Sequence, residues 1–133
     1  MEKIIDAVPV EDIIKELTEE RFVRKTNFGH NEIYIVNAHN APNTMREIGR
    51  LREWAFRESG GGTGKSMDID EFDTRDEAYF EQLIVWDPVE KEILGGYRFI
   101  ECNKLPIKNN GQVDTPTSEL FYYSDEFIKN YLP

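Results

Sequence analysis

Two apolar runs separated by a short polar segment constrain the fold more than any other feature of the sequence. They are Glu81–Asp87 (EQLIVWD) and residues 93–101 (ILGGYRFIE). The first run is nearly unbroken, which is typical of a strand buried on both faces. The intervening PVEKE has turn composition, so the two runs predict a β-hairpin, with a bulge at Gly95–Gly96. An apolar strand at a sheet edge invites further pairing, so we expect the hairpin to belong to a larger sheet.

The remaining elements are few. Helical spacing of apolar residues predicts a short helix over residues 10–17, and EIYIV predicts a strand at Glu32–Val36. A long helix is expected at Pro42–Glu58, beginning at its proline and ended by the glycines 60–62. Residues 102–117 have loop composition, and a last helix is expected after Ser124 as its N-cap. The inventory is α+β, with three strands.

Composition excludes several classes of protein. A chain of 133 residues fits one domain, and 39% hydrophobic residues suffice for a core. The net charge of −10 argues against binding nucleic acid or an anionic membrane surface. We expect no transmembrane segment, no secretory signal and, with one cysteine and no Cys/His cluster, no disulfide or zinc site. The expected location is the cytoplasm.

The glycine-rich stretch SGGGTGKS, residues 59–66, resembles a phosphate-binding loop. That motif needs a glycine five residues before the Gly-Lys-Ser, and Ser59 stands there instead. A phosphate-binding loop also follows a strand and opens a helix, whereas these glycines follow a helix and lead into a run of carboxylates. We therefore interpret the stretch as a loop that closes the helix, and we predict no nucleotide site.

Two arginines lie among apolar neighbours. In the long helix Arg52 shares a stripe with Met45, Ile48, Ala55 and Phe56. In the second hairpin strand, alternation puts Arg98 on one face with Leu94, Gly96 and Ile100, and puts Ile93, Tyr97 and Phe99 on the other. A partly buried guanidinium without a partner is costly, so each arginine should contact a carboxylate.

The acidic segment between the long helix and the hairpin offers these partners, in Asp68, Asp70, Glu71 and Asp73. Three interpretations are open: a solvated charge run, a calcium site, and an Arg/Asp network lining a polar pocket. Calcium is disfavoured because Phe72 occupies a position where an EF-hand needs an oxygen ligand. The network is favoured because it explains why Arg52 and Arg98 lie on apolar faces.

Taken together, LREWAF on a helix, then DIDEFD, then an apolar hairpin ending in GGYRFI resemble the acyl-homoserine-lactone (autoinducer) synthases. The resemblance is closer to their relatives, the hemolysin-like N-acyltransferases of the GNAT superfamily, which acylate ornithine or glycine and make lipoamino acids. Arg52, Phe56, Asp70, Asp73 and Arg98 occupy the positions of the family motif, and the resemblance covers about residues 45–101. It implies a GNAT-like, mixed and mainly antiparallel sheet flanked by helices.

The resemblance also implies what is missing. The loop after Phe56 is glycine-rich, where autoinducer synthases carry an aromatic residue, which disfavours their substrate. The glycine-rich turn that binds the pantetheine and pyrophosphate, with the Glu and Arg of a later strand, would lie beyond Pro133. Residues 1–133 are therefore expected to be a single domain that forms the N-terminal half of an acyltransferase domain, which is incomplete and need not be active alone.

The implied reaction is attack of an amine on an acyl carrier protein or CoA thioester, with no covalently bound cofactor and no metal. A small amino acid is a zwitterion, so its ammonium needs carboxylates and its carboxylate needs a guanidinium. Arg52, Phe56, Asp70, Asp73 and Arg98 are the expected binding and organising residues. No catalytic base is assigned, because arginine neighbours make Asp70 and Asp73 weak bases. The alternatives are a purely structural ion-pair cluster and a non-catalytic α+β module that binds a ligand or a basic partner.

Overall fold

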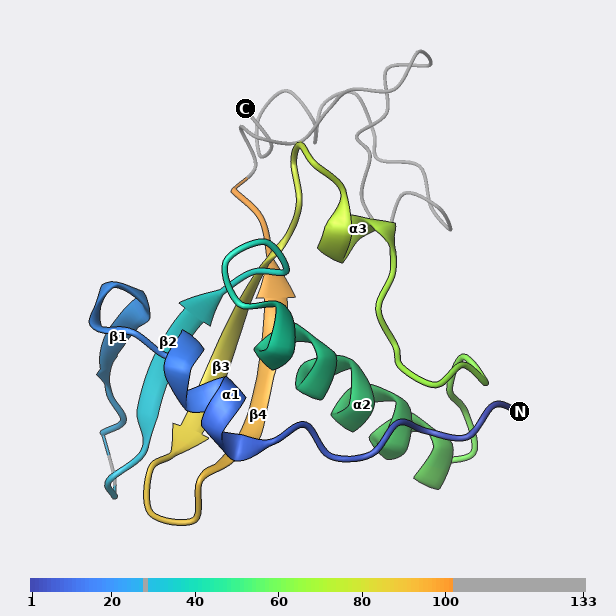
Figure 1. Cartoon of the computed structure of the whole chain (residues 1–133), viewed down its shortest axis with the longest axis horizontal. Coiled ribbons are helices and arrows are strands. Elements are labelled where there is room, and N and C mark those ends of the chain that lie inside the picture. Colours follow the sequence, from blue (N-terminus) through green and yellow to red (C-terminus); the bar gives the residue numbers. More distant parts are fainter. Residues whose placement is uncertain (28, 102–133) are drawn as a thin grey trace.

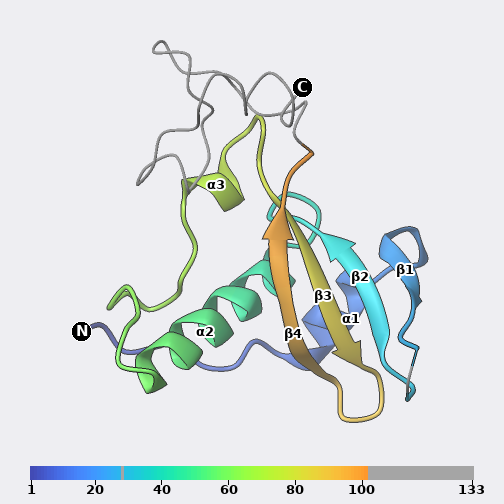
Figure 2. The same ribbon diagram turned by 180° about the vertical axis from the view of Figure 1, so that it is seen from behind.

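The computed structural model describes residues 1–27 and 29–101 of the chain. Its sheet has the strand order β1 (Phe22–Lys25), β2 (Glu32–Val36), β3 (Glu81–Asp87) and β4 (Glu92–Phe99), and all neighbours are antiparallel. The helices are α1 (Val10–Glu16), the 3-10 turn η1 (Glu19–Arg21), α2 (Pro42–Glu58) and α3 (Glu71–Thr74). Helices α1 and α2 lie on one face of the sheet, and no described helix covers the other (Figures 1 and 2). The α+β class with an antiparallel sheet is confirmed.

The expectation of three strands was wrong, because residues 22–25 form a fourth strand, β1, at the edge of the sheet next to β2. All four of its residues are exposed, and two of them are Arg24 and Lys25. A short solvated edge strand has no buried face, so it lacks the apolar alternation that indicates a strand. The expected loop of residues 102–117 and the helix after Ser124 lie outside the described residues.

Helix α1 is fixed to the start of α2 by one carboxylate. Pro42 begins α2, but Ala41 before it has no side chain that can cap the free backbone N–H groups. Glu16 at the end of α1 supplies this cap, accepting hydrogen bonds from the backbone N–H of Asn43 at 3.0 Å and of Thr44 at 2.7 Å. A negative charge at a helix N-terminus is also favoured by the helix dipole. The contact fixes where α2 starts above the sheet.

The other end of α2 is closed by the glycines, as the sequence predicts. Gly60 has a φ of 89°, a left-handed conformation that glycine adopts without steric cost. Its N–H donates to the carbonyl of Arg57 at 3.0 Å, and the N–H of Gly61 donates to that of Phe56 at 2.7 Å. This pair of bonds is the Schellman motif that ends many helices.

The core lies between the two helices and the sheet. Ile84 and Trp86 of β3 are 2% and 4% exposed and face the helices. The other buried apolar residues of this cluster are Val8, Ile13, Tyr34, Val36, Ala41, Met45 and Ile48. Leu83 and Val85 point to the opposite face and are only partly buried. The prediction that this strand is buried on both faces therefore holds on the helix side alone, within the part of the chain described.

The bulge in β4 differs from its predicted position and reverses part of the predicted pattern of faces. Val85 pairs with Gly95 and Trp86 pairs with Ile93, so the extra residue is Leu94, one position before the glycine pair. The insertion turns Ile93 toward the core, on the same side as Arg98, and leaves Leu94 half exposed. The expected placement of Ile93 on the face opposite Arg98 was wrong, because alternation is shifted at a bulge.

Candidate active site

Part of the acidic segment folds into the one-turn helix α3, which the sequence analysis did not predict. Asp70 is its N-cap and accepts a hydrogen bond from the backbone N–H of Phe72 at 3.0 Å. Asp73 reaches back and accepts one from the N–H of Asp70 at 3.1 Å. This reciprocal capping box brings the two carboxylates together. The spacing Asp-x-x-Asp is the signal that could have indicated this turn.

Asp73 is the centre of the site and is completely buried. Besides the N–H of Asp70, three side-chain groups approach its carboxylate: Gln82 Nε2 at 2.8 Å, Arg52 Nη1 at 3.3 Å and Arg98 Nη1 at 3.3 Å. A buried carboxylate is tolerated only when its charge and its hydrogen-bonding capacity are both satisfied, as they are here. Asp73 therefore organises its neighbours and presents no surface to a ligand.

Both arginines make the contacts that their apolar surroundings require. Arg52 bridges α2 to the sheet, because its other terminal nitrogen donates to Gln82 Oε1 on β3. Arg98 on β4 donates to Asp70 Oδ1 at 2.7 Å, and its guanidinium lies 5.6 Å from the ring centre of Phe80. The predicted pairing of Arg52 and Arg98 with the acidic segment is confirmed.

Solvent reaches some of these groups and not others. The side chains of Arg52 and Arg98 are 21% and 24% exposed, and that of Asp70 is 41% exposed. The site therefore offers two guanidinium groups and one accessible carboxylate above a buried carboxylate. This is a charge set that could bind a small zwitterion.

The ion pair between Asp70 and Arg98 favours the charged form of both side chains. Burial acts to raise the pKa of Asp70, but the hydrogen bond and charge of Arg98 outweigh it, so this pKa lies below its usual range. Burial opposes the charge of Arg98, and Asp70 and Asp73 more than offset this, raising its pKa. Asp68 differs, because burial, with a smaller contribution from the charge of Asp70, raises its pKa despite Arg52. Asp70 is thus an anion suited to binding a cation and a poor proton acceptor.

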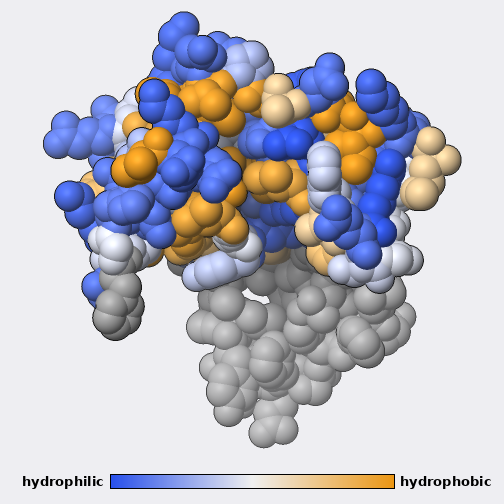
Figure 3. Space-filling model, turned by 90° about the horizontal axis from the view of Figure 1, so that it is seen from below, coloured by the Kyte–Doolittle hydropathy of each residue, from blue (hydrophilic) through white to orange (hydrophobic). Residues whose placement is uncertain are grey.

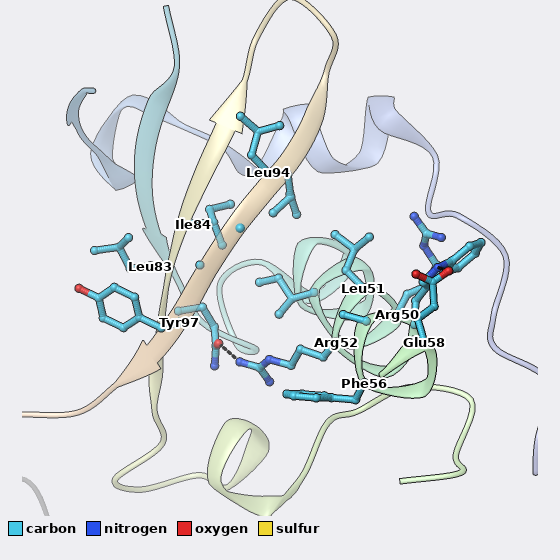
Figure 4. A pocket seen from close by; sticks show the side chains of 16 residues that line it. Arg50, Leu51, Arg52, Phe56, Glu58, Leu83, Ile84, Leu94 and Tyr97 are labelled. Carbon is cyan, nitrogen blue, oxygen red and sulfur yellow. Dashed lines mark hydrogen bonds between the residues drawn. The ribbon is translucent and has the colours of Figure 1, made fainter. Parts of the chain in front are cut away.

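Phe56 does not join the ion pairs. Its side chain is 54% exposed on α2, one turn after Arg52, and the two residues line a cleft of about 630 Å³ between α2 and β4 (Figure 4). We call this the α2–β4 cleft. Most of its lining is apolar, with Leu51, Ala55 and Phe56 from α2 and Ile84, Ile93 and Leu94 from the sheet. Four of the five expected residues therefore contact one another in the charge cluster. The fifth, Phe56, lies beside Arg52 in the lining of this cleft.

The glycine-rich stretch after α2 is held by a carboxylate of its own. Glu53, which is fully buried, accepts hydrogen bonds from the backbone N–H of Thr63 at 2.9 Å and of Gly64 at 3.0 Å. The hydroxyl of Thr63 and the guanidinium of Arg57 also donate to it, and these hydrogen bonds, led by that of Thr63 and opposed by burial, lower the pKa of Glu53 to about 2. The backbone N–H groups of Thr63 and Gly64 are thus already used by a carboxylate, which supports the interpretation of the stretch as a closing loop.

A family model described as an acetyltransferase (GNAT) domain matches residues 51–132, more than half of the chain. The chain belongs to this GNAT family. The matched part of the GNAT domain contains Arg52, Phe56, Asp70, Asp73 and Arg98. No solved structure matches the chain with significance.

Two curated relatives of this GNAT chain are described as glycine N(alpha)-acyltransferases. The protein of Bacteroides thetaiotaomicron is 55% identical over all 133 residues, which cover 39% of that relative. The protein of Phocaeicola vulgatus is 47% identical over the same residues, which cover 40% of it. The chain thus spans about two fifths of the length of the curated relatives it matches.

Sequence reasoning missed Gln82 and Glu53 of the GNAT domain. Gln82 is 1% exposed, and it accepts from Arg52 and donates to Asp73, so it orients both. Its signal was an amide beside the apolar residues 83–86 of the same strand. Glu53 gave no comparable signal, because one glutamate in a polar helical stretch does not reveal what it caps.

Within residues 1–27 and 29–101, no group of three or more His, Cys, Asp or Glu side chains is arranged to hold a metal ion. In the same residues no helix is long and apolar enough to cross a membrane.

Proposed function

We propose that the protein to which this chain belongs transfers a fatty acyl group from an acyl carrier protein or CoA thioester to the amine of a small amino acid. Glycine is the first candidate, because both curated relatives are described as glycine N(alpha)-acyltransferases. The proposal includes the hemolysin-like group of the GNAT superfamily, a cytoplasmic reaction and lipoamino acid products. It also assigns residues 1–133 to the N-terminal half of the acyltransferase domain.

One observation carries this proposal: the partly exposed Asp70–Arg98 pair lies beside Arg52, which is also partly exposed. In the proposed complex, the two guanidinium groups bind the carboxylate of the amino acid and Asp70 binds its ammonium group. Arginine suits the first task because its fork of N–H groups matches a carboxylate. Asp73 and Gln82 keep the arginines in place, and Phe56 borders the site on the side of the cleft.

The reaction forms a C–N bond between the amine and the thioester carbonyl carbon and breaks the C–S bond, releasing a thiol. The ammonium group must first lose a proton, because only the neutral amine has a free electron pair. The lowered pKa of Asp70 makes it a weak acceptor for this proton. Its role in the proposal is therefore to hold and orient the amine, and the proton passes to water or to a group outside the described residues.

The test is lipid extraction from cells that express the longer protein, with mass spectrometry of N-acyl amino acids. We expect N-acyl glycine from the wild type and a large loss in Asp70→Asn, because the amide keeps the shape of aspartate and loses its charge. Asp76→Asn is the matched control, since it removes the same charge from an exposed residue just after α3 and should leave the product unchanged.

Two outcomes would contradict the proposal. The wild type could yield no N-acyl amino acid above background, or Asp70→Asn could yield as much as the wild type. In the second case the cluster is structural only. In the first, a non-catalytic module that binds a ligand or a basic partner becomes the better interpretation of this chain.

A further inference from the structure

Asp68 lies beside the charge cluster, but its carboxylate takes no part in the hydrogen bonds of that cluster. Its backbone N–H donates to the carbonyl of Gly49 on α2 at 2.9 Å, and its backbone carbonyl accepts from Arg52 Nη1 at 3.5 Å. These contacts fix Asp68 against α2 next to Arg52. Within residues 1–27 and 29–101, no hydrogen bond or ion pair reaches its carboxylate. Its oxygens are therefore available to a water molecule or a substrate.

The charges that act on the Asp68 carboxylate come from three elements. Arg52 and Glu53 belong to α2, Asp70 is the N-cap of α3, and Arg98 lies on β4. Burial is the largest influence on the pKa of Asp68 and raises it; Arg52 and Arg98 lower it, and Asp70 and Glu53 raise it. The net effect is a pKa above the usual range, whereas the pKa of Asp70 lies below it. Of these two aspartates, Asp68 is the better proton acceptor.

Water can reach this part of the molecule. Asp68 is partly exposed, and the side chains of Arg52 and Asp70 are 21% and 41% exposed. Figure 3 shows a hollow in the surface of the described residues, with hydrophilic side chains beside apolar ones. A general base can act through one bridging water as well as by direct contact. An ammonium group held by Asp70 can therefore pass a proton to Asp68 through water.

We propose that Asp68 takes up, through a bridging water, the proton that the ammonium group of the amino acid loses, an inference that rests on the proposed function. The nitrogen loses two protons in all as the C–N bond forms. Asp68 receives the first, which leaves a neutral amine, and later releases it to the solvent. The second protonates the thiolate that departs when the C–S bond breaks. The two neighbouring aspartates thus have different tasks: Asp70 holds the amine and Asp68 accepts its proton.

Asp68→Asn in the longer protein tests this role, because the amide has nearly the same shape but cannot take up the proton. Thiol release from a hexadecanoyl thioester is measured at varied glycine, across the neutral to alkaline pH range. At neutral pH we expect kcat to fall at least about a hundredfold, the typical loss of a general base, with KM for glycine little changed. The loss should shrink as the pH rises, because more of the glycine is then already neutral. Asp76→Asn, at an exposed aspartate after α3, is the control and should keep the wild-type kcat at each pH.

Three results would overturn the inference. The first is a kcat of Asp68→Asn within about twofold of the wild type over the whole pH range. The second is a loss that is the same at every pH, complete loss included, because it assigns Asp68 a structural role. The third is a raised KM with unchanged kcat, because it assigns Asp68 to binding the amine. A wild type that releases no thiol in the presence of glycine refutes the proposed function instead.

Discussion

Removing the charge of Asp73 should destabilise the chain more than any other single charge removal in the described residues. Asp73→Asn keeps the size of the side chain but leaves the guanidinium groups of Arg52 and Arg98 without their shared carboxylate. It also turns an acceptor into a partial donor facing Gln82 and the N–H of Asp70.

The expected loss of stability follows from how deeply Asp73 and its two arginine partners are buried. Breaking a buried ion pair by removing one partner costs about 3–5 kcal/mol, and the partial exposure of both arginines favours about 3 kcal/mol. For a chain of this length that corresponds to a fall in Tm of roughly 10 °C. Urea unfolding followed by circular dichroism measures the change, with Asp76→Asn as the control of equal charge.

A double-mutant cycle isolates the ion pair from other effects of the substitution. In the background of Arg98→Met, Asp73→Asn should cost clearly less than in the wild type, because one of the stranded charges is gone. If the free energy of unfolding of Asp73→Asn lies within about 0.5 kcal/mol of the wild-type value, the network does not stabilise the fold and the reasoning fails.

Two further predictions concern Glu53 and the glycine pair of β4. The pKa of Glu53 is about 2 in the fold against an ordinary 4.5, so its contribution to stability is present above pH 4.5 and is lost as the pH falls toward 2. The free energy of unfolding measured at intervals over that range should fall more steeply for the wild type than for Glu53→Gln, and parallel curves would contradict this. Gly96→Ala should cost about 1–3 kcal/mol, because its Cβ would collide with the carbonyl oxygen of Leu83, whereas Gly95→Ala meets nothing and should stay within about 0.5 kcal/mol. Equal unfolding midpoints for the two alanine variants would refute that account of β4.

Strong local signals made much of the fold predictable. Pro42 and the glycines after Glu58 mark the two ends of α2, and the apolar run of β3 has no other good interpretation. Arg52 and Arg98 were informative for the opposite reason, because a charge on an apolar face requires a partner. The acidic segment was the obvious source of partners, which is why these contacts could be predicted from the sequence.

What could not be predicted depends on contacts between distant residues. Bulge position is set by how β3 and β4 pair, so the sequence indicated the glycine pair and missed Leu94. Solvated strands such as β1 carry almost no pattern, and a one-turn helix such as α3 is too short for periodicity. The hydrogen bonds of Gln82 and the loop held by Glu53 join residues at least nine positions apart, which no local pattern records.

The most direct test of the central claim, that the charge cluster binds an amino acid as a zwitterion, compares two acceptors. The purified longer protein is assayed with glycine and with glycinamide, which has the amine but no carboxylate. Glycinamide is the less basic amine and is more often in its reactive neutral form, so any preference for glycine must come from the protein. If Arg52 and Arg98 bind the acceptor carboxylate, kcat/KM should be at least about tenfold higher for glycine. A factor of that size is the usual contribution of a hydrogen bond between charged groups. Equal kcat/KM values for the two acceptors would contradict the claim.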